Sequence, residues 1–178
     1  MLAGLERDRS SYWPWLPWAR TDNRNLAECI FNIERFRRER EGTADNFGIG
    51  IADRETGKVI GGTSLHRLHV ASHQAEIGYY IHSHRRGQGL CTEAVAGLIS
   101  WAFMHQNAGG WGLRRIEILC AADNVPSQRV PQKLGLRQEV NKVAERWVDG
   151  VGWGGTLGWG VLSEEWDVAG RKLRAAAS

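Results

Sequence analysis

The feature that most constrains the fold is a run of four elements between Ala75 and Cys120: a strand, a glycine-rich loop, an amphipathic helix and a second strand. Polar and apolar residues alternate in AEIGYYI (75–81) and again in RIEILC (115–120), which is typical of half-buried strands. The helix starts at Thr92, and its apolar residues form one stripe: Val95, Leu98, Ile99, Ala102 and Phe103. A strand, a helix and a strand in this order predict a right-handed crossover between two parallel strands.

The flanking segments add antiparallel strands and two more helices. The predicted elements are a helix from Thr21 or Asp22 to about Arg40, a hairpin of strands 47–52 and 59–65 around the turn 53–58, a helix starting at 123–126 and ending at Gly135, strands 141–148 and 156–162, and a frayed tail 171–178. This order predicts a mixed α/β fold, with a mostly antiparallel sheet, one parallel crossover and flanking helices. The 178 residues suit a single domain over 1–178.

The loop before the helix reads Arg86-Gly87-Gln88-Gly89-Leu90-Cys91-Thr92. Small residues allow a tight turn in which successive N–H groups point into one concavity, and the helix N-terminus adds unpaired donors and a positive dipole. The loop therefore predicts a phosphate site. It differs from the nucleotide motifs G-x-x-x-x-G-K-[ST] and G-x-G-x-x-G, and neither G-x-S-x-G nor H-E-x-x-H occurs. These absences exclude the commonest hydrolase and zinc-protease classes.

Composition narrows the function classes further. The net charge is +3, and no apolar stretch is long enough to cross a bilayer. The N-terminus lacks the layout of a secretory signal, which predicts a cytoplasmic location without a membrane partner. The three cysteines, Cys29, Cys91 and Cys120, are scattered, and the histidines at 66, 69 and 73 lack a cysteine or carboxylate framework, so neither a disulfide framework nor a metal site is expected.

Nine tryptophans are the outlier of the composition. Three fall within residues 13–18, and four lie beyond Glu145. Aromatic residues at both ends of a chain predict a shared pocket wall, and an equally good interpretation is that they fill the core.

The loop resembles the Q/R-x-x-G-x-G/A signature of GNAT-type acetyltransferases, matched by Arg86, Gly89 and Cys91. Further segments resemble the Rim-type branch of that family, which acetylates the N-termini of ribosomal proteins. In collinear order they are PWLPW (14–18), AEIGYYI (75–81), GQGLCTEAV (87–95), LRRIEILCAADN (113–124), SQRVPQKLGL (127–136) and LSEEW (162–166). The chain differs in two respects. Pro131 stands at a helix position where alanine is usual, which predicts a distortion of the helix after Ser127. The family's first strand and part of a helix, ahead of PWLPW, have no expected counterpart in this chain.

The resemblance implies acetyl-CoA as co-substrate. Its pyrophosphate would lie on the backbone N–H groups of residues 86–92, and its pantetheine arm would lie along Tyr80, Ile81 and His82. An N–H group of Ile81 or His82 would polarise the thioester carbonyl. Asn124 would hold the pantetheine or the helix end, and Ser127 would donate a hydrogen bond to the departing thiolate.

Two glutamates are candidates for the base that deprotonates the acceptor amine. Glu76 shares a strand face with Gly78 and Tyr80. The Rim-type pattern also has a glutamate in a later strand, but Glu145 is one residue out of step with it, which reverses the strand face. Either glutamate is equally well explained as a solvated strand residue.

These features together predict an N-acetyltransferase acting on a primary amine, with a protein or peptide N-terminal α-amine preferred. A small-molecule amine, such as an antibiotic or metabolite, is the first alternative, and a non-catalytic acyl-CoA-binding or nucleic-acid-binding module is the second. Nucleic-acid binding lacks support, because the basic residues do not interleave with stacking aromatics. An unpaired edge on strand 47–52 predicts a homodimer that uses the N-terminal segment or the final strands.

Overall fold

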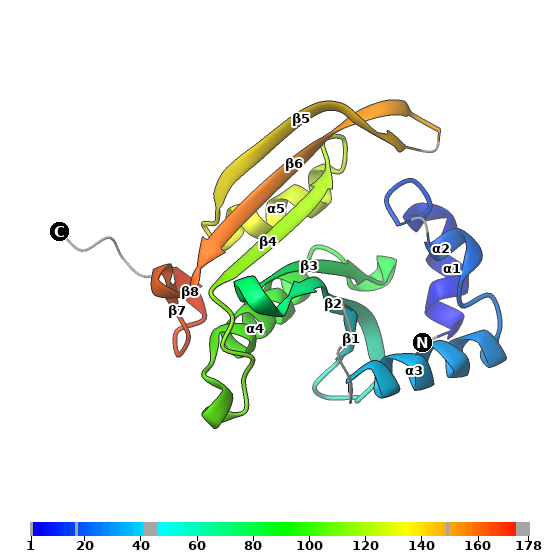
Figure 1. Cartoon of the computed structure of the whole chain (residues 1–178). Coiled ribbons are helices and arrows are strands. Elements are labelled where there is room, and N and C mark those ends of the chain that lie inside the picture. Colours follow the sequence, from blue (N-terminus) through cyan, green and yellow to red (C-terminus); the bar gives the residue numbers. More distant parts are fainter. Residues whose placement is uncertain (1, 17, 41–45, 149, 174–178) are drawn as a thin grey trace.

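The computed structural model describes residues 2–16, 18–40, 46–148 and 150–173. At its centre lies a six-stranded sheet in the order β1-β2-β3-β4-β6-β5 (Figure 1). The strands are β1 (Asn46–Ala52), β2 (Val59–His69), β3 (Gln74–Ile81), β4 (Arg115–Ala121), β5 (Arg137–Val148) and β6 (Gly152–Leu162). Neighbouring strands are antiparallel except β3 and β4, which are parallel. The predicted mixed fold with one parallel crossover is confirmed.

The helices form two groups (Figure 1). The first gathers beside β1, β2 and β3: α1 (Leu2–Tyr12), α2 (Trp18–Thr21) and α3 (Leu26–Arg40). The second packs on the sheet and consists of α4 (Leu90–Phe103), the crossover helix between β3 and β4, and α5 (Val125–Lys133). Among the described residues, no helix is both long and apolar enough to span a bilayer.

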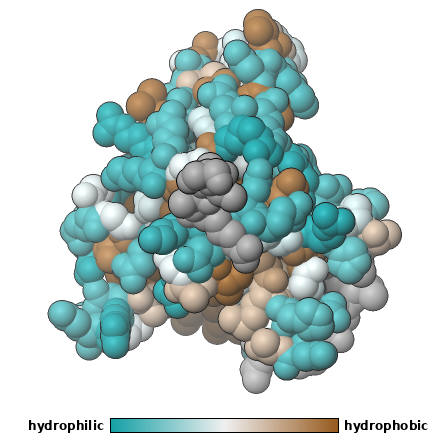
Figure 2. Space-filling view, turned by 90° about the vertical axis from the view of Figure 1, so that its left-hand side faces the viewer, coloured by the Kyte–Doolittle hydropathy of each residue, from teal (hydrophilic) through white to brown (hydrophobic). Residues whose placement is uncertain are grey.

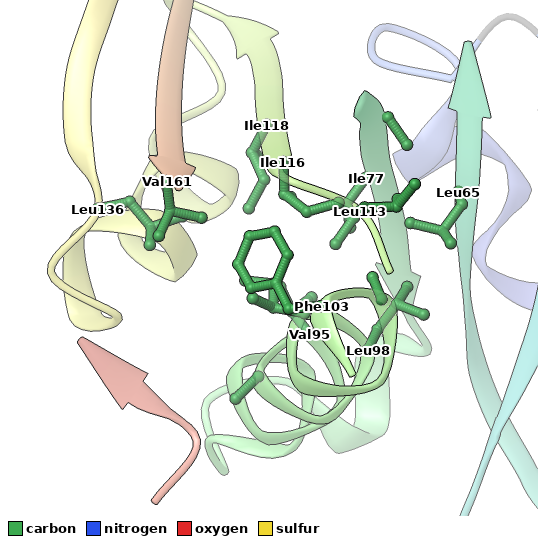
Figure 3. Packing of buried hydrophobic residues seen from close by; sticks show 14 of the residues in the cluster. Leu65, Ile77, Val95, Leu98, Phe103, Leu113, Ile116, Ile118, Leu136 and Val161 are labelled. Carbon is green, nitrogen blue, oxygen red and sulfur yellow. The ribbon is translucent and has the colours of Figure 1, made fainter. Parts of the chain in front are cut away.

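The main core lies between the sheet and α4 (Figure 3). The predicted helix stripe is fully confirmed, since its five members are all buried. They pack against the inward residues of the strands, including Ile77, Ile116 and Ile118, each at most 1% exposed. Burial of one such aliphatic side chain contributes about 1.5–3 kcal/mol, which makes this layer the main source of stability.

The first group of helices differs from expectation. The expectation that the helix ahead of PWLPW is missing is wrong, because residues 2–12 form α1. Its buried residues Leu5, Asp8 and Tyr12 follow helical spacing, but one of the three is charged, so an apolar pattern does not reveal it. For α3 the end at Arg40 is as expected, but the helix begins at Leu26 and not after Thr21 or Asp22. Its apolar stripe faces outward: Leu26 is 63% exposed and Ile30 51%.

The C-terminal predictions need two corrections. The last two sheet strands both begin four residues earlier than predicted, at Arg137 and Gly152. In the tail, β7 (Trp166–Asp167) pairs with β8 (Lys172–Leu173), so fraying from Arg171 onward is wrong for the paired residues, and 174–178 lie outside the described residues.

The two edges of the sheet differ in character. β5 carries Arg137, Glu139, Lys142, Glu145 and Arg146 along one edge, and the face of the molecule on this side is mainly hydrophilic (Figure 2). Charged edge strands of this kind resist pairing with another chain. β1, with the sequence NFGIGIA, forms the opposite edge of the sheet in the described part of the chain and carries no charge.

Some of the tryptophans line a pocket and others fill the core, so each of the two predicted roles applies to part of the set. Trp15 and Trp18 line a cleft, whereas Trp159 and Trp166 are buried in the core. Trp147 and Trp153 stack edge to face near the turn between β5 and β6, where they are 62% and 69% exposed. A wall shared between the two ends of the chain is therefore wrong, because the tryptophans that line the cleft are Trp15, Trp18 and Trp101, and none of the four beyond Glu145 is among them.

Candidate active site

The candidate site is a cleft that opens where β3 and β4 separate. Only three residues of each strand pair, Gln74–Glu76 with Arg115–Glu117. Beyond them β4 stays paired with β6, and β3 stays paired with β2. A cleft of about 1460 Å³ begins there and reaches the glycine loop, the start of α4, α5 and the N-terminal helices.

The free edge of β3 supplies unpaired backbone groups. The His82 N–H donates to the Ile60 carbonyl (2.8 Å), so the even-numbered residues of β3 point their backbone groups at β2. By alternation, Ile77, Tyr79 and Ile81 point theirs into the gap between β3 and β4. Of the two N–H groups expected to polarise a thioester, that of His82 is therefore engaged elsewhere, whereas Ile81 faces the gap.

The remaining predicted residues at the end of β3 serve the N-terminal helices. Tyr80 packs edge to face against Tyr12 and Trp18, with ring centroids 5.5 and 5.3 Å apart. The His82 ring is 2% exposed and lies so close to Gly4 that an added Cβ would sit 1.7 Å from it. Burial lowers the pKa of His82, so this imidazole is neutral at neutral pH.

The glycine loop has the shape that an anion site needs. Gly87 and Gly89 adopt left-handed φ angles of 78° and 79°, and an added Cβ at either would meet no atom within 4 Å. Gly89 is also the N-cap of α4 and has no side chain to satisfy the first N–H groups of the helix. Those donors, together with Leu90, Cys91 and Thr92 of the first turn, border the cleft.

The arginines beside the loop have other partners. Arg86 donates to the Ser11 hydroxyl (2.9 Å) and lies over the Tyr12 ring. Arg85 donates to Asp53 (2.6 Å) and to Gln88. Hydrogen bonds from Thr56 and Arg85 lower the pKa of Asp53 to about 2, so this pair is ionic at neutral pH. Both arginine side chains are thus engaged by other residues, so the phosphate site predicted at this loop depends on its backbone N–H groups.

Ser127 and Tyr79 bridge the cleft between α5 and β3. Asn124 caps α5 by accepting from the Ser127 N–H (3.2 Å). The Ser127 hydroxyl donates to the Tyr79 hydroxyl (3.2 Å), which in turn donates to the Ser127 carbonyl (2.8 Å). Burial raises the pKa of Tyr79, so the phenol keeps the proton that it donates.

Pro131 explains why that carbonyl is available. In a helix, the N–H of residue 131 would donate to the carbonyl of residue 127, but proline has no N–H. The helix nevertheless continues to Lys133, with Pro131 buried inside it. The expected distortion of this helix therefore does not end it, and the freed carbonyl is satisfied by Tyr79 instead.

The two candidate glutamates lie in different surroundings. Glu76 borders the cleft and is held by His66 (3.1 Å) and Arg67 (3.0 Å). Glu145 lies in an irregular stretch of β5, where it accepts from the Thr156 hydroxyl (2.5 Å). Hydrogen bonds from Thr156 and Lys142 lower the pKa of Glu145, which disfavours proton uptake there.

The cysteine at the loop is not a nucleophile in this structure. Cys91 borders the cleft, and burial raises its pKa to about 12, so it remains a thiol at neutral pH. Burial likewise raises the pKa of Cys120. Cys29, Cys91 and Cys120 are all free. Within the described ranges, no three side chains of the metal-binding types cluster together.

Contacts that position α1 beside the cleft escape prediction from sequence. Asp8 (4% exposed) accepts from the Ser83 N–H (2.6 Å) and hydroxyl (2.5 Å), which fixes α1 beside the glycine loop. Burial favours the neutral acid, but hydrogen bonds from Arg7 and Ser83 outweigh it and hold the pKa of Asp8 well below its ordinary value. Tyr12 donates to the Ile81 carbonyl (3.0 Å). A polar residue at helical spacing between Leu5 and Tyr12 is the only signal that points to α1.

Comparison with known proteins agrees with this geometry. The family profile described as "Acetyltransferase (GNAT) domain" matches residues 2–137. The putative ribosomal N-acetyltransferase YdaF of Bacillus subtilis is 35% identical over 96 residues, which cover 54% of this chain and 50% of the relative. The ribosomal-protein-serine acetyltransferase of Escherichia coli is 31% identical over 127 residues, covering 71% and 63%. The chain thus spans between half and two thirds of these relatives.

A solved structure shares the fold. Mycobacterium smegmatis RimJ in complex with CoA-disulfide superposes with a TM-score of 0.78 at 24% identity, over 96% of this chain and 80% of that chain. The family profile covers more than half of the sequence, and the relatives include ribosomal-protein acetyltransferases. The chain therefore belongs to the GNAT family of acetyltransferases and has relatives in its Rim-type branch.

Proposed function

We propose that this protein transfers an acetyl group from acetyl-CoA to a primary amine, with an N-terminal α-amine of a protein or peptide as acceptor. The observation that carries the proposal is one continuous cleft. It joins the free edge of β3, the positive-φ glycine loop and the uncapped start of α4.

The residues present fit acetyl-CoA. The N–H groups at Gly87, Gly89 and the first turn of α4 would hold its pyrophosphate, and the free edge of β3 at Ile81 would pair with its pantetheine arm. When bound, it would supply an acetyl group activated as a thioester. The Ile81 N–H would polarise the carbonyl, and Ser127 would offer its hydroxyl to the leaving sulfur.

The acceptor is inferred from the relatives and from proton chemistry. Both relatives compared above carry ribosomal acetyltransferase names. An N-terminal α-amine has a pKa near 8, against about 10.4 for lysine, so it needs less help to lose its proton. A small-molecule amine stays the alternative acceptor, because Trp15 and Trp18 suit either kind of ligand.

Calorimetry with CoA tests the binding site. Gly89→Val should abolish binding, because it strains a left-handed residue and fills the backbone approach to the phosphate. Gly109→Val is the matched control. Gly109 has φ 82° and equally open surroundings, but it caps a 3-10 turn outside the cleft. Loss of affinity in both variants, or in neither, would contradict the assignment.

Free-thiol release with a panel of amines tests the reaction. N-terminal peptides should be the best acceptors, and CoA binding without release from any amine would indicate a non-catalytic acyl-CoA module. Glu76→Gln and Ser127→Ala should each lower turnover by roughly a hundredfold with CoA affinity kept, whereas Glu145→Gln should change it little. Near-normal turnover in all three would assign the proton transfers to water and backbone.

The wider setting of the protein is part of the proposal. Residues 1–178 would act as one domain in the cytoplasm, where free cysteines persist. A homodimer would use the uncharged edge of β1 and the exposed apolar stripe of α3, two features of one end of the molecule. Light scattering that gives a monomer at micromolar concentration, across a range of salt, would contradict the dimer.

A further inference from the structure

Three polar residues on the cleft wall form a chain in which each lies 3.1 Å from the next: Ser64, His66 and Glu76. The Ser64 hydroxyl lies 3.1 Å from Nδ1 of His66, and Nε2 of His66 lies 3.1 Å from a carboxylate oxygen of Glu76. All three residues border the cleft. The His66 and Glu76 side chains are 28% and 14% exposed, so they are shielded but still reachable.

A break in β2 builds this chain. His66 and Arg67 are consecutive, and their side chains would point to opposite faces of a regular strand, yet both contact Glu76. The register shifts after His66, and Arg67 adopts a left-handed φ of 51°. Such bulges redirect side chains and are frequent beside active sites, and a non-glycine residue at positive φ persists only where its surroundings enforce it.

A glycine makes room for the chain. Gly78 lies opposite Ser64 in the neighbouring strand. A Cβ at Gly78 would sit 2.6 Å from Cε1 of His66 and 3.3 Å from the Ser64 hydroxyl oxygen. Any larger residue would displace the imidazole from its two partners.

The positions of the partners favour one tautomer of His66. A carboxylate only accepts, so a proton on Nε2 would face Glu76. Nδ1 would then carry a lone pair that can accept from the Ser64 hydroxyl. The group that a ligand in the cleft would meet is therefore the Ser64 hydroxyl, which lies beside a basic nitrogen of His66.

We propose that His66 is the proton acceptor for the incoming amine, that Ser64 relays the proton and that Glu76 is a positioning residue. This proposal rests on the acetyl transfer proposed above. An N–H bond of the ammonium breaks, its proton passes to the Ser64 oxygen as the Ser64 proton passes to Nδ1, and the nitrogen keeps the lone pair for attack. The His66 cation formed lies against the Glu76 carboxylate and later returns the proton to solvent.

Charged groups around His66 come from three strands. Glu76 and Arg67 contact each other as described, and Glu117 of β4 is in register with Glu76. Glu117 is itself paired with Arg115 (2.6 Å). The charged group nearest to the imidazole is thus the Glu76 carboxylate, 3.1 Å from Nε2.

The test measures thiol release at saturating acetyl-CoA, with an amine that the wild type accepts, between about pH 5.5 and about pH 9. His66→Gln should lower turnover roughly a hundredfold or more. It should also remove the increase of turnover with pH that an imidazole base would produce. Glu76→Gln should lower turnover but retain this dependence on pH, because the amide can still hold the ring although it carries no charge to compensate the proton that His66 accepts. Ser64→Ala should lower turnover without changing how turnover depends on pH. His69 is a histidine of the same strand outside the cleft, so His69→Gln is the control and should match the wild type.

The outcomes separate the two proposals. A wild type that releases no thiol with any amine overturns both. An active wild type with an unchanged His66→Gln overturns the role of His66 alone. Loss of this dependence on pH in Glu76→Gln with its retention in His66→Gln would make Glu76 the base instead. CoA affinity and thermal melting of each variant, measured in parallel, show that a loss of turnover is not a loss of folding.

Discussion

The two helical groups of this protein are attached to the sheet in different ways. On one side, α4 buries a continuous apolar stripe against β3, β4 and β6. On the other, α1 and α2 share a small apolar cluster of Leu5, Tyr12 and Ala19 and depend on single polar contacts such as Asp8 with Ser83. The cleft lies where these two attachments meet. We therefore expect a rigid layer behind the free edge of β3 and a more weakly held layer along the part of the cleft lined by Leu5, Tyr12 and Trp18.

The largest effect should come from the rigid layer. Ile99 of α4 is 0% exposed in the main core. Ile99→Ala should lower the free energy of unfolding by about 2–5 kcal/mol, through lost burial and the cavity left behind. Urea denaturation followed by circular dichroism measures this. A loss below about 1 kcal/mol would mean that the core beneath the sheet is looser than its burial indicates.

An intermediate effect should come from the contact that holds α1. Asp8→Asn weakens the bonds to Ser83 and should cost about 1–3 kcal/mol of local stability. Hydrogen exchange should rise in α1 while the amides of α4 stay protected. Equal loss of protection in both helices would show that the two layers unfold together, against the comparison drawn above.

The same contact predicts a dependence on pH. The pKa of Asp8 in the folded protein is held below its unfolded value of about 3.8, so its contribution is complete above about pH 5. It is lost as the pH falls from there toward the folded pKa. The difference in α1 protection between wild type and Asp8→Asn should therefore shrink between pH 7 and pH 3. If the difference stays constant, the charge of Asp8 does not contribute to the protection of α1, which contradicts this prediction.

A smaller effect should come from the bridge across the cleft. Tyr79→Phe removes a donor from the Ser127 carbonyl and should cost about 1 kcal/mol. In a Pro131→Ala background the restored N–H can serve that carbonyl, so the same substitution should cost less. A double-mutant cycle by urea denaturation measures the coupling. Equal costs in both backgrounds would contradict the role given to Pro131.

The smallest effect should come from the outward stripe of α3. Ile30→Ala is the same chemical change as Ile99→Ala, but Ile30 is 51% exposed. It should alter the unfolding free energy by less than about 0.5 kcal/mol at low protein concentration. If the proposed dimer uses this stripe, the variant should instead weaken association in light scattering. A large loss of stability in the monomer would show that the stripe is buried in solution.

Much of the sheet and its crossover follows from the sequence alone. Alternation in β3 and β4 and the 3.6-residue stripe of α4 each report burial directly, because an apolar side chain must leave water whichever partner it meets. The glycine loop was predictable for a related reason, since two closely spaced glycines before a helix allow the left-handed backbone that Gly87 and Gly89 adopt. These features depend on neighbours within one or two turns.

The contacts between distant segments were decided by the tertiary structure. The periodicity of α3 predicts the helix correctly but not that Ile30 faces outward, because a pattern does not say which partner is present. The sequence also does not reveal that Arg86 turns to Ser11, that Pro131 frees a carbonyl for Tyr79, or that a bulge at Arg67 joins His66 to Glu76. Each is a polar contact between segments that only the folded chain brings within 3.5 Å, and contacts of this kind leave no periodic pattern in the sequence. The sheet, its crossover and the glycine loop thus follow from local patterns, whereas the chemistry of the cleft depends on how the N-terminal helices and β2 are placed around them.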